Sequence, residues 1–176
     1  LTKFALNLIH FCMQAAILKE LEQIVGAEHI FTDKENREKY ASDHTEDLHF
    51  PPDVVIKPRT AQEISSVMKL CNLHSIPVTP RGAGTGLSGG ALADQGGVMI
   101  SFERMNSILE IDEQNLQVTV EPGVITEVLQ QAVKEKGLFY PPDPSSKGSC
   151  FIGGNIAENS GGPKALRSEE HTSELQ

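Results

Sequence analysis

Apolar residues recur with a helical period near the start of the chain. Across residues 15–25 the apolar positions repeat every three or four residues, and Gly26 follows directly. This pattern predicts an amphipathic helix that ends at the glycine. The next stretch, 31–49, is charged and has no apolar period, so it predicts an irregular arm.

Two short runs rich in β-branched residues, 53–57 and 76–79, predict strands. A second helical pattern lies between them, with Thr60 and Glu63 at the spacing of a capping box. Strand, helix and strand in this order predict a βαβ unit. The apolar face predicted for this helix consists of Ile64, Val67, Met68 and Cys71.

The second half of the chain predicts mainly antiparallel structure. Strands are expected at residues 98–102, 108–112 and 117–121, and Thr126 is expected to cap a further helix. Val128, Leu129, Ala132 and Val133 form the apolar face of that helix, and Gly137 follows its end. Residues 139–163 are dense in Pro, Gly, Ser and Asn, which predicts a long loop and completes an α+β pattern.

Composition narrows the classes of function. The chain has 176 residues and a net charge of −9, which argues against nucleic-acid binding. Its three cysteines have neither metal-ligand nor disulfide spacing, which favours a reducing compartment, and Cys150 is expected to be a small buried residue. No segment reaches the ~20 apolar residues of a transmembrane helix. His44 and His49 are expected to be solvated, so no metal site is predicted.

A glycine-rich loop follows the predicted strand at 76–79. Five glycines lie within the nine residues 82–90. The Walker A motif fails because Gly90 and Ala91 stand where lysine and a hydroxyl residue are needed. The spacing of a dinucleotide fingerprint is present, but a turn and a strand follow instead of a helix, so a classical Rossmann site fails too. A phosphate-binding loop and a plain connecting loop both stay open.

A second glycine cluster occupies residues 152–162. Two such clusters in one small α+β unit suggest the two sides of one extended ligand. Because the chain is acidic and Arg81 is the only cation of the first loop, backbone N–H groups are expected to hold the phosphates.

Several segments together resemble a known family. The chain from about residue 18 to 166 resembles the N-terminal part of the FAD-binding domain of the vanillyl-alcohol oxidase/p-cresol methylhydroxylase (PCMH) class. Within this class it is similar to the glycolate oxidase and D-lactate dehydrogenase family. The expected fold is therefore an incomplete PCMH-type FAD-binding domain. The matching segments are 50–53, 80–91, 121–124, 137–145 and 152–162.

The resemblance implies a set of FAD-binding residues. Where some members of the class attach FAD to a histidine, this chain has Thr85, which implies non-covalent FAD. Asp143 and Glu158 are expected to support or cap turns. The residues implied at the diphosphate are Arg81, Gly82, Ala83, Gly84, Thr85, Gly86, Leu87 and Ser88, and those beside the flavin are Pro122, Gly123, Pro144, Ser145, Gly153, Gly154 and Asn155.

The function implied is that of a flavin-dependent dehydrogenase that converts glycolate or D-lactate to a 2-oxo acid. Iron–sulfur partner subunits and a cytoplasmic location, peripheral to the inner face of the membrane, are further implications. The catalytic residues are unknown and expected outside this chain, which alone should be inactive. The alternatives are a D-2-hydroxyglutarate or alkyl-glycerone-phosphate enzyme of the same fold, or a non-catalytic fragment.

Four segments are expected along the chain. Residues 1–17 form an extension, with Met13 as a plausible true start, and 18–49 form a helix and arm. Residues 50–166 form the partial FAD-binding domain. Residues 167–176 resemble a translated sequencing adapter, so we expect a truncated chain with a foreign tail.

Overall fold

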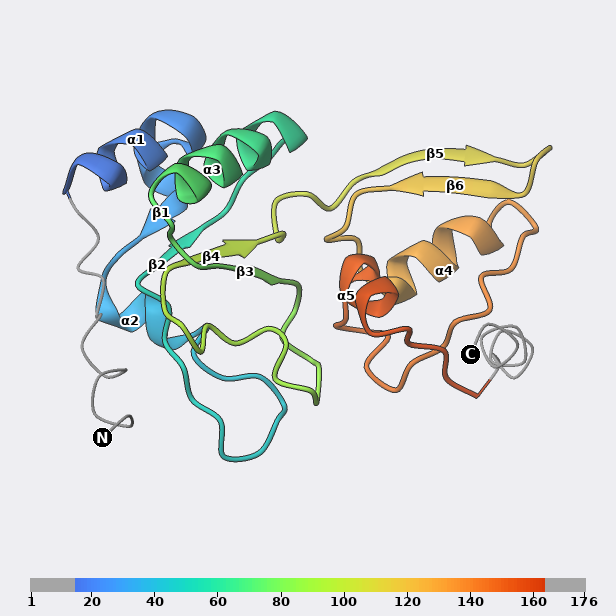
Figure 1. The fold of residues 1–176 in the computed structure, drawn as a ribbon. Helices are drawn as coiled ribbons and strands as arrows, with labels where there is room; N and C mark the ends of the chain where they lie inside the picture. The colour runs from blue at the N-terminus through green and yellow to red at the C-terminus, as the bar shows by residue number, and fades with distance from the viewer. Residues whose placement is uncertain (1–14, 164–176) are drawn as a thin grey trace, which may run out of the picture. The chain divides into compact units, whose positions relative to one another are not determined.

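The computed structural model describes residues 15–163 (Figure 1). Met13 and the predicted foreign tail lie outside this range. Within it the chain divides into two compact units. The first unit contains the residues up to Arg81 together with Leu87–Ser101, and the second contains Gly82–Gly86 and the residues from Phe102 onward.

The first helix of unit 1 is the predicted one. Helix α1 (Ala15–Val25) buries Ile17, Leu21 and Val25 on one face. Gly26 has φ 87° and donates its N–H to the Glu22 carbonyl at 2.9 Å, so it ends the helix as predicted. The helix begins at Ala15, inside the segment expected to be an extension.

The arm after α1 is more regular than predicted. It contains the 3₁₀ helix η1 (Ala27–His29), the strand β1 (Ile30–Phe31) and the helix α2 (Lys34–Glu38). The Asp33 side chain caps α2 by accepting from the Asn36 N–H at 3.0 Å. Elements this short are not long enough to show a periodic pattern of apolar residues, so the sequence pattern does not predict them.

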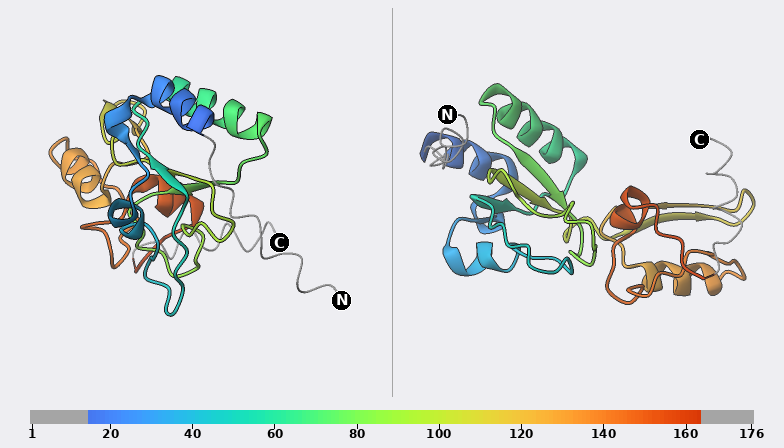
Figure 2. Two further views of the ribbon diagram at one scale, coloured as in Figure 1. Left: turned by 90° about the vertical axis from the view of Figure 1, so that its left-hand side faces the viewer. Right: turned by 60° about the horizontal axis from the view of Figure 1, so that its bottom comes forward.

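A four-stranded sheet with the order β1-β2-β4-β3 forms the centre of unit 1 (Figures 1 and 2). β2 (Val54–Ile56) and β3 (Val78–Arg81) both pair in parallel with β4 (Val98–Ser101), which lies between them. The helical crossover of the predicted βαβ unit is therefore present. The antiparallel assignment of β4 is wrong, because the residues of this strand are buried throughout and give no alternation that would mark its partner.

The crossover helix α3 (Ala61–Leu73) begins as the sequence predicts. The Thr60 hydroxyl accepts from the Glu63 N–H at 3.2 Å, while the Glu63 carboxylate accepts from the Arg59 N–H at 2.7 Å. The buried face differs in part from the prediction, since Leu70 is buried, Ile64 is half-buried and Met68 is 45% exposed.

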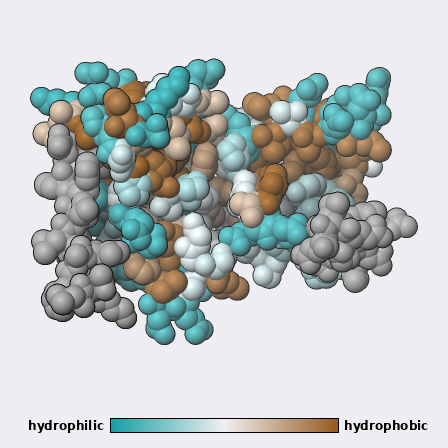
Figure 3. Space-filling model, viewed as in Figure 1, coloured by the Kyte–Doolittle hydropathy of each residue, from teal (hydrophilic) through white to brown (hydrophobic). Residues whose placement is uncertain are grey.

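Unit 2 contains the predicted antiparallel hairpin of β5 (Ile108–Asp112) and β6 (Gln117–Val120). Hydrophobic residues gather on the surface near this hairpin (Figure 3). Helix α4 (Thr126–Lys134) packs Leu129 and Val133 against Val124 and Ile152.

Three predictions for unit 2 are wrong in detail. Ile125, not Thr126, is the N-cap of α4, and no side chain caps this helix. Val128, expected in the core, is 52% exposed. The predicted loop contains the helix α5 (Ile152–Ala157). The sequence did not predict this helix because its two glycines have low helix propensity.

Candidate functional site

The first glycine loop presents unpaired backbone donors. Within the described part of the chain, the N–H groups of residues 82–86 donate to no backbone carbonyl. Gly84 has φ 71°, which glycine adopts without strain. Unpaired N–H groups in succession are the usual means of binding an anion without a cationic side chain.

The guanidinium of Arg81 contacts protein carbonyls. Its Nη1 lies 3.3 Å from the Tyr40 carbonyl oxygen and 3.2 Å from that of Ala91, and its Nη2 lies 2.7 Å from that of Ser42. The group also lies 5.6 Å from the centre of the Tyr40 ring. These contacts join the arm to the end of β3. The predicted contact between Arg81 and the FAD diphosphate stays a prediction.

Two glycines of unit 2 are required by close protein packing. A Cβ at Gly153 would lie 2.8 Å from Pro122 Cβ and 3.1 Å from Pro122 O. A Cβ at Gly123 would lie 2.2 Å from the Phe102 carbonyl oxygen. Close packing between protein segments thus accounts for Gly123 and for the contact between Gly153 and Pro122.

Two other glycines have no such requirement. At Gly86 and at Gly154 an added Cβ would meet nothing within 4 Å, and neither residue has a positive φ. Neither backbone conformation nor protein packing explains these glycines. Open space beside the main chain is what a closely bound ligand needs.

The structure brings the two glycine clusters together in unit 2. A Cβ at Gly82 would lie 3.7 Å from Phe151 Cβ and 4.0 Å from the backbone nitrogen of Gly154. The start of the first loop therefore lies against the start of α5. This proximity supports the expectation that both clusters serve one ligand.

Asn155 belongs to a buried polar cluster. Its Nδ2 donates to Thr126 Oγ1 at 2.5 Å, and Thr126 Oγ1 lies 3.2 Å from Cys150 Sγ. Asn155, Thr126 and Cys150 are 6%, 0% and 4% exposed. Cys150 is buried as predicted. Thr126 was expected only to cap the next helix, so its contact with Asn155 could not be foreseen from the sequence.

The segment containing Pro144 and Ser145 lies at the end of the second glycine cluster. The Asp143 N–H donates to the Gly161 carbonyl at 2.9 Å, and a Cβ at Gly162 would lie 2.2 Å from the Asp143 carbonyl oxygen. The Asp143 carboxylate lies 2.9 Å from Lys147 Nζ and raises the pKa of that ammonium group. Asp143 thus stabilises the turn, as expected.

The other predicted loop residues divide between the units. Gly82, Ala83, Gly84, Thr85 and Gly86 belong to unit 2, whereas Arg81, Leu87 and Ser88 belong to unit 1. Leu87 and Ser88 are exposed. Their shared role around one diphosphate stays a prediction.

Comparison with known proteins identifies the family. Residues 52–175 match the family model described as an FAD binding domain. The chain belongs to this FAD-binding family. FAD is accordingly its cofactor, as the resemblance implied.

Several relatives of this family member are named as enzymes of hydroxy acids. It is 48% identical to glycolate oxidase subunit GlcD of Bacillus subtilis over 86% of the chain and 32% of the relative. It is 47% identical to D-lactate dehydrogenase of Anaerostipes hadrus over 66% of the chain and 24% of the relative. The chain thus spans about a third or less of the length of these relatives.

Solved structures confirm the fold. An alkyldihydroxyacetonephosphate synthase aligns with a TM-score of 0.74 and 19% identity over 82% of this chain and 31% of its own. A p-cresol methylhydroxylase aligns with a TM-score of 0.62 and 24% identity over 70% of this chain and 25% of its own. The predicted partial PCMH-type domain is therefore confirmed.

The residues of unit 2 fit this cofactor. Gly86 and Gly154 leave space beside the main chain, and residues 82–86 offer N–H donors suited to a diphosphate. Thr85 carries no ring nitrogen that could form a covalent bond to a flavin.

Proposed function

We propose that this chain is the FAD-binding portion of a dehydrogenase that oxidises a 2-hydroxy acid, with glycolate or D-lactate as the substrate. The similarity to glycolate oxidase subunit GlcD and to D-lactate dehydrogenase supports this assignment. When bound, FAD supplies the two-electron redox chemistry of such a reaction. The chain spans about a third of GlcD, and in the proposal the residues that bind the substrate and move its proton are not among those described here.

The single structural observation that carries FAD binding in this proposal is the open space at Gly86 and Gly154. In the proposed role these glycines let the cofactor approach the backbone, while the N–H groups of residues 82–86 bind its diphosphate. Gly123 and Gly153 keep the supporting segments close together. FAD is held without a covalent bond, since Thr85 takes the position of the attaching histidine.

Partner subunits form the second part of the proposal. GlcD is named as a subunit of glycolate oxidase, which supports an assembly with further subunits. We infer that iron–sulfur partner subunits accept the electrons. In this proposal the protein is cytoplasmic, and these partners hold it at the inner face of the membrane. Among the described residues, no helix has the length and apolar character needed to cross a membrane.

A second substrate is favoured by a specific similarity. The chain is 38% identical to D-2-hydroxyglutarate dehydrogenase of Stutzerimonas stutzeri over 86% of its length and 33% of the relative. This substrate is also a 2-hydroxy acid. The likeness to alkyldihydroxyacetonephosphate synthase concerns the fold alone.

The test uses the intact protein that carries this sequence. Purified protein should show the visible absorbance of a flavin, and acid precipitation should release all of it into the supernatant. Dye reduction should be fastest with glycolate or D-lactate. Flavin that stays with the precipitate would refute non-covalent binding, and a preference for D-2-hydroxyglutarate would select the alternative.

A further inference from the structure

The hydroxyl of Thr126 takes part in a buried hydrogen bond at the start of helix α4. Thr126 is the first residue of α4, the N-cap position belongs to Ile125, and no side chain caps this helix. The side chain is fully buried, and its Oγ1 lies 2.5 Å from the donating Nδ2 of Asn155. The hydroxyl is therefore directed to Asn155 and away from its own helix.

Cys150 offers the Thr126 hydroxyl an acceptor for its proton. Its carbonyl oxygen lies 3.4 Å from Thr126 Oγ1, and its Sγ lies at 3.2 Å. A carbonyl oxygen can only accept, so it draws the Thr126 proton and leaves the Thr126 oxygen to accept from Asn155. The Asn155 amide is thus fixed with Nδ2 toward Thr126, and its Oδ1 points away from that hydroxyl.

The side-chain cluster is not needed to hold the two segments together. The backbone already does so, with Thr126 N–H donating to Cys150 O at 3.1 Å, Ile152 N–H to Val124 O at 2.9 Å, and Gly153 N–H to Pro122 O at 2.8 Å. Burying an asparagine costs free energy unless its polar groups are used. The hydrogen bonds described for the two segments use the backbone and Asn155 Nδ2, and none of them uses Asn155 Oδ1.

Asn155 directly follows Gly154, one of the two open glycines, and Gly82 lies against the Gly154 backbone nitrogen. We propose that Thr126 is a positioning residue: together with Cys150 it fixes the Asn155 carboxamide so that Oδ1 accepts a hydrogen bond from an N–H or hydroxyl group of bound FAD. This inference rests on the proposed function and names a contact within it.

The test compares two substitutions at one position. Thr126→Val removes the hydroxyl at nearly constant volume, and Thr126→Ser keeps it. FAD affinity, measured by quenching of flavin fluorescence on titration of the apoprotein, should fall about three- to tenfold in Thr126→Val, the usual value of one neutral hydrogen bond. Thr126→Ser should stay within about twofold. The visible absorption spectrum of the bound flavin should shift in the valine variant only.

A double-mutant cycle separates positioning from a structural role. In the Asn155→Ala background, Thr126→Val should produce no further loss of FAD affinity, because the group that it orients is gone. Additive losses would overturn the inference. Should the valine variant lack a cooperative thermal transition, Thr126→Ala, which cannot overfill the site, replaces it in the same cycle.

The two proposals fail in different ways. If the unsubstituted protein does not bind FAD, the proposed function falls and the inference falls with it. If it binds FAD and Thr126→Val binds equally well, the inference alone falls.

Discussion

At the scale of single residues, four glycines of the second unit have two different kinds of surroundings. Gly153 and Gly123 are glycines because protein atoms occupy the place of a Cβ. Gly154 and Gly86 have free space there. Neighbouring residues in one motif, Gly153 and Gly154, can therefore be distinguished by experiment.

We predict different effects on stability for alanine at Gly153 and Gly154. Gly153→Ala places a methyl group 2.8 Å from Pro122 Cβ and should cost about 1–3 kcal/mol. Gly154→Ala should be neutral or stabilise α5 by up to about 1 kcal/mol, because alanine favours helix. Urea unfolding measures both values, and equal losses would contradict the assignment.

Arg81 carries a separate prediction. Its guanidinium reaches the carbonyls of Tyr40, Ala91 and Ser42, which an ammonium group cannot span. Arg81→Lys should lower the free energy of unfolding by about 1–3 kcal/mol. Arg37→Lys is the control with a smaller expected loss, since Arg37 Nη1 donates to the Pro52 carbonyl. Similar losses of unfolding free energy in the two variants would show that the hydrogen bonds of Arg81 contribute no more to stability than that of Arg37.

At the scale of elements, the sequence predicts what is local. The helices α1 and α3 are predicted by the period of their apolar residues, with Gly26 at the end of α1 and Thr60 at the start of α3. The β5–β6 hairpin is predicted by two strand-like runs joined by a polar turn. The partner of β4 could not be predicted, because a fully buried strand has no polar face and pairing depends on distant residues.

The site was predictable to a similar extent. The two glycine clusters stand out in the sequence, and family resemblance supplied the residues within them. The helix α5 was hidden because Gly153 and Gly154 lower helix propensity, and packing on Pro122 compensates. Thr126 was missed since a threonine before a helix is normally interpreted as a cap.

The hairpin turn carries a prediction about pH. Asp112 Oδ2 accepts from Asn115 Nδ2 at 2.6 Å, and Oδ1 accepts from the Asn115 and Gln114 N–H groups at 3.0 Å each. These hydrogen bonds lower the pKa of Asp112 below its usual value, and the bond from the Asn115 side chain has the largest effect. The ionised Asp112 carboxylate therefore stabilises the hairpin at pH values above its unfolded-state pKa. This stabilisation is lost as the pH falls through the lower folded-state pKa, because the carboxylate is then protonated.

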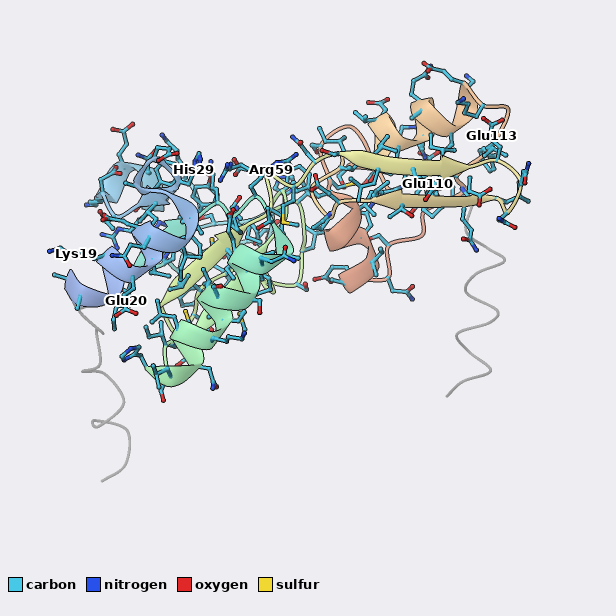
Figure 4. All side chains as sticks on the ribbon, turned by 90° about the horizontal axis from the view of Figure 1, so that it is seen from above. Lys19, Glu20, His29, Arg59, Glu110 and Glu113 are labelled. Carbon is cyan, nitrogen blue, oxygen red and sulfur yellow. The ribbon has the colours of Figure 1, made fainter. Side chains whose placement is uncertain are left out.

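Amide hydrogen exchange of β6 at decreasing pH, corrected for intrinsic rates, measures this effect. Exchange should accelerate on acidification in the wild type and lose this dependence in Asp112→Asn. Glu110→Gln, on the same hairpin, is the control and should behave as the wild type (Figure 4). Unchanged acid sensitivity in Asp112→Asn would refute the role of the Asp112 carboxylate.

At the scale of the whole molecule, the first glycine loop is divided between the units. Gly82–Gly86 belongs with unit 2, whereas the residues on either side of it belong with unit 1. Nothing in the local pattern indicates this division, since it depends on contacts between residues far apart in the sequence. The proposed FAD-binding residues Gly82, Gly86, Gly154 and Asn155 fall together in unit 2.

The central claim is that FAD lies against the open backbone at Gly86 and Gly154. The direct measurement is an FAD titration of the wild type, Gly86→Ala, Gly154→Ala and the control Gly148→Ala, whose nearest neighbour is the flexible Glu127 carboxylate. We predict at least about tenfold weaker binding for the first two variants, because a methyl group would fill the space that the cofactor needs. Gly148→Ala should bind as the wild type does. Equal affinity in all four proteins would contradict the claim.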